Sequence, residues 1–504
     1  MTGPTSAGNC ERFAGILLHP TSLPGRYGIG DLGDELTAFL DWAASAGMKI
    51  WQVLPLNPTG FGNSPYGCLS SFAGNPLLIS PQRLLHEGLL PYHVIENVPS
   101  FPDDHVDFDA VAAFKDNLLR VSFAHFEATA HDDLRRALAD FVAADAQQGW
   151  LDDWTLFMAL KQRLGDAKWS GWEPSLARRA PEAMALARNE LADEIRFQQY
   201  VQWLFFRQWR AVRDAARSRG ILIMGDVPIY VAEDSADVWA ARELFQLDEN
   251  GAPAIVAGVP PDYFSATGQR WGNPLYRWDL MREDGYRWWI ERIRANLRLA
   301  DVIRLDHFRG FSAYWEIPAT EPTAIHGRWV PGPGLELFKA IGTALGGIPL
   351  VAEDLGFITQ EVHDLRRTIG VPGMKILQFG FSEIDSPHLP HRYDPATVAY
   401  TGTHDNDTAR GWFASAPAPE RYYAQTYFGS DGTAIEWPMI RAVYTSVAQT
   451  AIVPVQDILG LGSEARMNRP GNSKDNWSWR YPAGALTSGA AETLRSLAEV
   501  SGRL

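Results

Sequence analysis

The sequence predicts an α/β protein built on a (β/α)8 TIM barrel with inserted, mostly helical subdomains. Short apolar runs of strand length recur along the chain, and a polar or Gly/Pro-rich loop and an amphipathic helix follow them. Near-continuous apolar strands that alternate with helices are typical of a parallel sheet covered on both faces. Eight such runs can be counted, and eight favour closure of the sheet into a barrel.

The predicted strands lie in these eight runs. In chain order they are "FAGILLHP" (13–20), "MKIWQVLPL" (48–56), "GILIMGDVPIY" (220–230), "ADVIRLDH" (300–307), "IPLVAEDLG" (348–356), "MKILQFGF" (374–381), "VAYTGTHDND" (398–407) and "AIVPVQDILG" (451–460).

Uneven spacing between the runs predicts where segments are inserted. Residues 82–193 have a helical pattern and form a predicted insertion, after which 194–219 form the helix that leads back to the barrel and stops at Gly220. Residues 231–278, rich in Gly, Pro and aromatic residues, follow the C-terminal end of a strand, where barrel active sites are built. The predicted division of the chain is 10–81 (first two strands), 82–193 (helical insertion), 194–230 (helix and third strand), 231–278 (insertion over the active site) and 279–504 (remaining strands).

Composition limits the classes of function. A net charge of −15 over 504 residues argues against sequence-independent binding to nucleic acid or to an anionic membrane. The two cysteines, Cys10 and Cys68, favour neither a disulfide framework nor a zinc site. The first residues do not have the pattern of a secretory signal and no apolar run is long enough to span a membrane, so the cytoplasm is expected. Without a phosphate loop or a dinucleotide fingerprint, no cofactor is expected, and the sequence does not predict an oligomeric state.

Charged residues end several of the predicted strands. In "ADVIRLDHFRG" the two-residue period of a strand places Arg304 and Asp306 on one face. The other charged strand ends carry Asp226, Glu353, His404 with Asp405, and Asp457. If the strands close a barrel, Asp306, Glu353 and Asp405 converge at one of its ends.

Two kinds of chemistry use carboxylates around a cleft. Metal-assisted hydrolysis is one, and "THDND" offers part of a ligand pattern. Cleavage of a glycosidic bond is the other, with one carboxylate as nucleophile and one carboxylic acid roughly 5–5.5 Å away in retaining enzymes. Arg304 beside Asp306 suits an ionised nucleophile, and Glu353 with carboxylate neighbours suits an acid of raised pKa.

The sequence resembles glycoside hydrolase family 77, the amylomaltases or 4-α-glucanotransferases, over nearly its whole length. The resemblance is carried by "GILLHPTSLPGRYGIGDLG", "LPLNPTGFGNSPYGCLSSFAGNPLLIS", "GDVPIYVAEDSADVW", "GVPPDYFSATGQRWGNPLYRW", "IRLDHFRGF", "VAEDLG", "PGMKILQF", "YTGTHDNDT", "QDILGLGSEARMNRPG" and "NWSWRYP". Of these, "GQRWGNPLY" and "THDNDT" are specific even singly. The helical segment 82–193 is the least similar to the family.

The resemblance implies a double displacement on α-1,4-glucans, without a metal. It implies that Asp306 is the nucleophile, Glu353 the general acid/base and Asp405 the stabiliser of the transition state. The implied substrate-binding residues are Arg304 and His404 in the −1 subsite, Asp226 and His307 at the barrel mouth, and Tyr66, Asp262, Gln269 and Trp271 in loops that contact the glucan. The implied partners are α-1,4-glucans and maltooligosaccharides.

Other interpretations stay open at this point. The histidines could be satisfied core residues, and Tyr263, Phe264 and Trp271 could anchor their own loop. The same carboxylates would serve an α-amylase-like hydrolase, and a non-catalytic glucan-binding protein would need only the binding groups. Arg309 and Glu316 are expected to be structural, and no role is assigned to Asp457.

Overall fold

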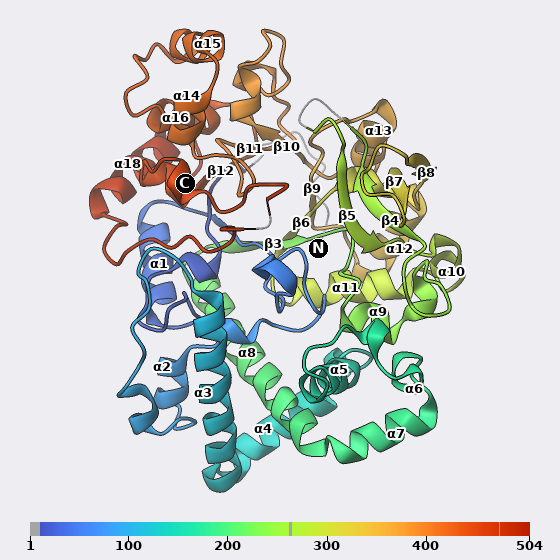
Figure 1. Ribbon diagram of the computed structural model, residues 1–504. Helices are drawn as coiled ribbons and strands as arrows, with labels where there is room; N and C mark the ends of the chain where they lie inside the picture. The colour runs from blue at the N-terminus through green and yellow to red at the C-terminus, as the bar shows by residue number, and fades with distance from the viewer. Residues whose placement is uncertain (1–10, 262–264, 473) are drawn as a thin grey trace.

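The computed structural model describes residues 11–261, 265–472 and 474–504, and its centre is a parallel sheet closed into a barrel (Figure 1). Around the barrel the strands are β1 (Phe13–Leu17), β2 (Ile50–Gln52), β3 (Leu222–Val227), β6 (Val302–Leu305), β9 (Leu350–Ala352), β10 (Gly373–Ile376), β11 (Thr397–Tyr400) and β12 (Thr450–Pro454). The Ala352 N–H donates to the Pro372 carbonyl at 2.9 Å and so joins β9 to the start of β10. Each strand lies within or overlaps one of the eight predicted runs, and the predicted barrel is confirmed.

Helices follow most of the strands and cover the barrel. They are α1 (Asp34–Ser45), α8 (Ala192–Ser218), α11 (Arg287–Leu297), α12 (Gly334–Leu345) and α13 (Gln360–Ile369), then α14 (Ala409–Ser415), α15 (Ala418–Phe428) and α16 (Glu436–Thr445), and finally α17 (Val455–Ile458) and α18 (Ser488–Val500). The connection 377–396, all of it described, holds short 3-10 turns between β10 and β11 but no α-helix. The regular alternation is therefore broken at this one connection.

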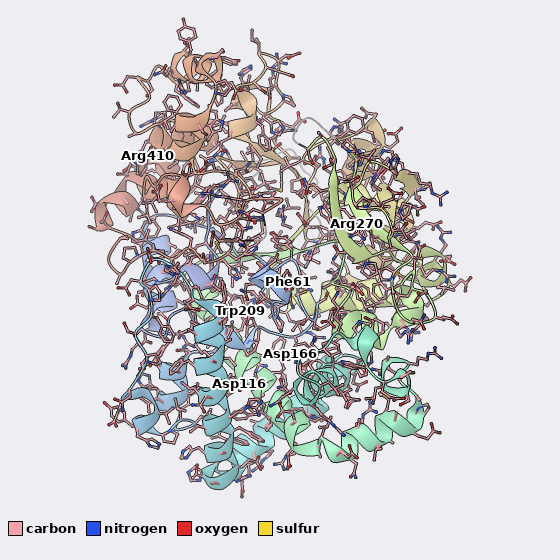
Figure 2. The ribbon with its side chains drawn as sticks, viewed as in Figure 1. Phe61, Asp116, Asp166, Trp209, Arg270 and Arg410 are labelled. Carbon is pink, nitrogen blue, oxygen red and sulfur yellow. The ribbon has the colours of Figure 1, made fainter. Side chains whose placement is uncertain are left out.

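Helix α8 returns the chain to the barrel as the sequence predicts. Its apolar stripe is buried and consists of Phe197, Val201, Leu204, Phe205, Trp209 and Val212. The indole N–H of Trp209, labelled in Figure 2, donates to the Leu299 carbonyl at 2.9 Å, which ties the helix to the segment before β6. Gly220 has a φ of 70°, in the left-handed region that glycine adopts at no steric cost.

Residues 82–193 are largely helical and lie with α8 in the lower part of Figure 1. The helices are α2 (Pro81–His86), α3 (Phe108–Thr129), α4 (Asp132–Ala143), α5 (Leu151–Arg163), α6 (Pro174–Ala177) and α7 (Pro181–Glu190). Lys115 of α3 is buried, donates to the Ile79 carbonyl at 2.6 Å and lies 3.6 Å from Asp31. This buried side chain fastens α3 to the connections that follow β1 and β2.

A second sheet, which the sequence analysis did not predict, lies to the right of the barrel in Figure 1. Its antiparallel strands are β4 (Ile255–Val259), β5 (Gln269–Pro274), β7 (Ala313–Pro318) and β8 (Arg328–Pro331), in the order β5-β4-β7-β8. Two short helices, α9 (Ala236–Ala240) and α10 (Trp278–Glu283), flank β4 and β5 in the chain. Because β4 pairs with β7, the insertion 231–278 shares a sheet with the connection that follows β6. Arg270 marks β5 in Figure 2, where Phe61 marks the loop after β2.

The N-terminal ends of the strands are held together by one arginine. Arg503 is completely buried, and its guanidinium donates to the carbonyls of Phe13 and Gln449 at 3.1 Å each, next to the starts of β1 and β12. It also donates to Tyr444 at 2.7 Å and to Ala448 at 2.8 Å. Among the helices of the described ranges, none combines the length and the apolar character that a membrane crossing requires.

Candidate active site

Carboxylate side chains gather at the C-terminal ends of the barrel strands. Asp226 lies in β3, Asp306 follows β6 and Glu353 follows β9. The N–H of Asp306 donates to the carbonyl of Val227 at 2.9 Å, and that of Glu353 donates to Leu305 at 3.1 Å. These bonds continue the parallel register beyond the strand ends, so the structure brings the predicted residues of adjacent strands to one rim.

Arg304 lies between two carboxylates of this rim. Its Nη1 is 2.6 Å from Asp226 Oδ2, and its Nη2 is 2.8 Å from Asp306 Oδ1. The side chains of Arg304 and Asp226 are 3% and 0% exposed, whereas that of Asp306 is 29% exposed, so Asp306 is the most exposed of the three. Burial alone would lower the pKa of the guanidinium, but the two carboxylates raise it well above its ordinary value, and Arg304 stays charged.

Glu353 is held by the backbone of both neighbouring loops. The His307 N–H donates to its Oε2 at 2.8 Å, and the Leu355 N–H donates to its Oε1 at 3.0 Å. His307 has a φ of 50°, a left-handed conformation that is uncommon for a residue with a Cβ, directly after Asp306. Burial and the charge of Asp306 raise the pKa of Glu353 to about 8. Glu353 therefore carries a proton at neutral pH although two amides favour its ionised form.

Asp405 is the third carboxylate, in the loop after β11. Its Oδ2 lies 3.3 Å from His404 Nε2, and its Oδ1 accepts from Asn468 Nδ2 at 2.6 Å. The surrounding protein displaces water and would raise the pKa of Asp405, but His404, Asn468 and Arg304 together hold that pKa well below its ordinary range. The side chain keeps 41% exposure, so an ionised carboxylate is open to solvent after β11.

Aromatic side chains from two loops contact the histidines of the rim. The ring of Tyr66 stacks on that of His404, with centroids 5.2 Å apart and an angle of 15°, and its hydroxyl donates to Asp226 Oδ2 at 2.8 Å. On the other side Trp271 of β5 stands at 89° to His307, with centroids 4.8 Å apart. Two groups of predicted residues thus enclose the carboxylates from different loops.

Gln269 joins the group through the indole. The Nε1–H of Trp271 donates to Gln269 Oε1 at 3.1 Å, and Trp271 stays 38% exposed. Burial lowers the pKa of His307 to about 4, so its imidazole is neutral when it faces the ring. Asp262, together with Tyr263 and Phe264, lies outside the described residues.

The loop 463–479 contributes groups that the sequence analysis quoted in a motif but did not assign. Besides the amide of Asn468, Arg466 Nη2 donates to the carbonyl of Asp405 at 3.0 Å. Trp477 packs near both rings of the stacked pair, 5.8 Å from Tyr66 and 6.0 Å from His404. The segment "ARMN" could have identified these residues. Its arginine and asparagine are not part of a helix or strand pattern, so a structural role in such an element does not account for them.

Three further residues, for which the sequence predicts a structural role or none, make contacts away from the rim. Asp457 is buried and accepts from the Thr401 hydroxyl at 2.6 Å and the Ala409 N–H at 2.7 Å, and burial raises its pKa to about 6. The guanidinium carbon of Arg309 lies 3.6 Å from the ring centre of Trp329. Glu316 forms an ion pair with Arg328 across β7 and β8. These contacts bind loops and strands to one another and do not reach the rim carboxylates.

A protonated carboxylic acid beside an arginine-paired carboxylate, at the mouth of a (β/α)8 barrel, defines the class of carboxylate-dependent enzymes that break or exchange glycosidic bonds. Comparison with known proteins narrows the class. The family model described as 4-alpha-glucanotransferase matches residues 18–487. The chain belongs to this family, glycoside hydrolase family 77.

Individual relatives agree with the family match. The 4-alpha-glucanotransferase of Synechocystis is 49% identical over 500 residues, which cover 98% of each chain. That of Thermus thermophilus is 49% identical over 503 residues, covering 98% of this chain and 99% of the relative. The amylomaltase of Streptococcus agalactiae, solved in complex with acarbose, superimposes with a TM-score of 0.94 at 38% identity, covering 98% of this chain and 100% of the relative.

Proposed function

We propose that this enzyme transfers a segment of an α-1,4-glucan to the 4-hydroxyl of glucose or of another α-1,4-glucan. Maltooligosaccharides would be disproportionated in this way, and a glucan whose own end serves as acceptor would be cyclised. One observation carries the proposal: Glu353, with a pKa of about 8, shares a rim with Asp306, which is paired to Arg304. An acid and an anion in this arrangement are what a retaining double displacement requires.

In the first half of the reaction Glu353 protonates the glycosidic oxygen and Asp306 attacks the anomeric carbon. The C–O bond to the reducing-end fragment breaks, that fragment leaves with the proton, and a glycosyl ester forms on Asp306. The charge-assisted bond from Arg304 at 2.8 Å orients the carboxylate and keeps it ionised before the attack.

In the second half the 4-hydroxyl of an incoming glucan replaces the leaving fragment. Glu353, now ionised, takes the proton of this hydroxyl, and the new C–O bond forms as the ester breaks, so the anomeric configuration is retained. The amides of His307 and Leu355 stabilise the ionised form in this interval. Water competes with the acceptor, and the aromatic loop 251–278 is the proposed barrier against it.

The remaining rim residues are proposed to bind the sugar. Asp405 stabilises positive charge at the anomeric carbon in the transition state, and its short bond to Asn468 supports a fixed, ionised carboxylate. The proposed contacts of the glucan are Arg304, His404, His307, Asp226, Tyr66, Asp262, Gln269 and Trp271. Among them Tyr66 and Trp271 combine an apolar ring with a polar edge, which suits the C–H face and the hydroxyls of a pyranose.

Two broader statements belong to the same proposal. The enzyme is assigned to carbohydrate metabolism in the cytoplasm, in line with its two cysteines. The chain is divided into a barrel interrupted by a helical subdomain at 82–193 and by the active-site insertion at 231–278.

Incubation with maltotriose tests the transfer. We expect glucose together with a ladder of longer maltooligosaccharides, at a constant number of reducing ends. An increase in reducing ends without a ladder would instead identify an α-amylase-like hydrolase. A protein that binds maltotriose without any product would be a non-catalytic glucan-binding protein.

Asp306→Asn tests the assignment of the nucleophile. We expect the rate of disproportionation to fall by at least about 10³-fold while glucan binding, measured by calorimetry, persists. Asp279→Asn changes an exposed carboxylate on α10 and serves as the control. If Asp306→Asn keeps the wild-type rate, the assignment is wrong.

A further inference from the structure

A small cavity is lined by His404 and does not have Asp405 in its wall. Its volume is about 20 Å³, and a cavity needs about 10–15 Å³ on the same measure to hold one water molecule. Its wall includes His19, Ser22, His404, Asp457 and Arg466. The cavity therefore has room for one small polar molecule next to a residue of the rim.

Two imidazole nitrogens of the residues in this wall have no hydrogen-bond partner within the described ranges 11–261, 265–472 and 474–504. They are Nδ1 of His19, which follows β1, and Nδ1 of His404, which follows β11. Both side chains are buried, with 7% of His19 and 5% of His404 exposed. A buried polar atom without a partner destabilises the fold, so native proteins supply a partner or an ordered water.

The other polar groups of the wall are already engaged. Asp457 accepts from Thr401 and Ala409, and Asp407 accepts from Thr408 and Ser463. Asn406 Oδ1 accepts twice from Thr403, from its N–H and from its hydroxyl. The atoms of the wall that still need a hydrogen-bond partner are therefore the two imidazole nitrogens.

The partners of His404 also determine where its proton lies. Nε2 faces the ionised Asp405 at 3.3 Å, so Nε2 carries a proton, and Nδ1 is the ring atom left without a partner. Burial lowers the pKa of His19 to about 3, so the His19 ring is neutral. A water molecule can donate to His404 Nδ1 and use its remaining hydrogen or lone pairs for His19 Nδ1.

We propose that the cavity holds one ordered water that bridges His19 and His404, and that His19 is a positioning residue for the reaction. The bridge keeps the proton of His404 on Nε2 and prevents rotation of the ring, so that Asp405 keeps its donor. The inference rests on the proposed function only through the roles given to His404 and Asp405.

Substitutions of His19 that differ by one methylene test the bridge. Asn places an amide near the position of Nδ1 and Gln places it beyond, while Leu removes the polar group. We expect His19→Asn to keep most of the wild-type kcat, and both His19→Gln and His19→Leu to lose about 10-fold in kcat, the cost of one unsatisfied buried acceptor. KM for maltotriose should change less than kcat. Equal rates for Asn, Gln and Leu would overturn the inference.

A spectroscopic measurement on the wild type does not depend on the folding of any variant. Long-range ¹H–¹⁵N spectra of the ¹⁵N-histidine-labelled enzyme should show His404 with a proton on Nε2, with His404→Gln used for the assignment. A crystal structure of the same enzyme at about 1.3 Å should show the water on both Nδ1 atoms. A ring without a proton on Nε2, or a dry cavity, would overturn the inference.

The proposed function fails by a different result. If Asp306→Asn retains activity, the mechanism is wrong, whereas the tautomer of His404 and the water still report on the bridge. If Asp306→Asn is inactive but His19→Leu keeps the wild-type rate and tautomer, only the role of His19 is refuted.

Discussion

The two ends of the barrel each bury an arginine, and the two arginines have opposite surroundings. At the C-terminal end Arg304 meets the carboxylates of Asp226 and Asp306. At the N-terminal end the hydrogen bonds of Arg503 within the described residues all go to main-chain carbonyls, among them those of Phe13 and Gln449. The carboxylates raise the pKa of Arg304 well above its ordinary value, whereas burial and the nearby Arg12 lower the pKa of Arg503 to about 9.

The comparison separates two uses of a buried cation. A guanidinium bonded to neutral carbonyls joins segments of backbone and contributes to stability alone. A guanidinium shared by two carboxylates fixes the charge and direction of groups that can react. Burial by itself therefore does not identify a functional arginine, but the charge of its partners does.

The largest effect is expected from Glu353→Gln, which leaves the C-terminal end intact except for its acid. The glutamine cannot protonate the leaving oxygen, so kcat for maltotriose disproportionation should fall by about 10³-fold or more. Initial rates of glucose release measure the loss. Glu361→Gln on α13, an exposed site, is the control, and comparable rates for the two variants would refute the role of Glu353 as the acid.

The same substitution at both ends sharpens the comparison directly. Lysine keeps the charge but not the planar fork, so Arg304→Lys should lower kcat by about 100-fold because it cannot hold both carboxylates. Arg503→Lys should leave kcat unchanged and lower the free energy of unfolding by about 1–3 kcal/mol, since carbonyls lose their donors. Urea unfolding and steady-state rates measure both variants. A catalytic defect in folded Arg503→Lys would contradict the division between the two ends.

The acidity of Glu353 predicts a pH dependence at the C-terminal end. Because its pKa is raised from 4.5 to about 8, the native state binds a proton there that the unfolded state has released between these pH values. The free energy of unfolding should therefore fall as pH rises across this window, and kcat/KM should decline above about pH 8. Glu353→Gln should remove this contribution to the pH dependence of stability. Identical unfolding-versus-pH curves for wild type and variant would show that the pKa is not raised.

The smallest effect is expected from Tyr66→Phe, which removes one hydrogen bond from the rim. Loss of the bond to Asp226 should reduce kcat/KM by about 3- to 10-fold, while the ring still stacks on His404. Tyr400→Phe is a matched control inside the barrel, because its hydroxyl donates to Gln52 at 2.8 Å. Steady-state rates should distinguish the two, and an equal loss in Tyr400→Phe would assign the effect to packing.

The barrel was predictable because each of its strands is a short apolar run, and such runs are local in sequence. The second sheet was not predictable from the sequence, because β4 pairs with β7 although a barrel strand lies between them in the chain. Neither segment has a local pattern that indicates its partner strand. The absence of an α-helix between β10 and β11 was also not predicted, because the sequence analysis assumed a regular alternation of strands and helices there.

The same distinction applies to the site. The charged residues at strand ends were found because a carboxylate directly after a buried strand is unusual, and the barrel then brings Asp306 and Glu353 to one rim. Asn468 was missed because it contacts Asp405 from a loop far along the chain, where an asparagine is an ordinary residue. His19 was missed because its surroundings, a cavity shared with His404, exist only in three dimensions.

The influence of Asp306 on the acidity of Glu353 has a consequence for the timing of the catalytic cycle. Under the proposed mechanism the nucleophile loses its negative charge when it forms the ester, and with that charge goes one cause of the raised pKa of Glu353. The same residue is then a weak acid in the free enzyme and a stronger one in the intermediate. Glu353 releases its proton when the glycosidic bond breaks and stays ionised until the acceptor arrives. Its change from general acid to general base therefore needs no conformational change.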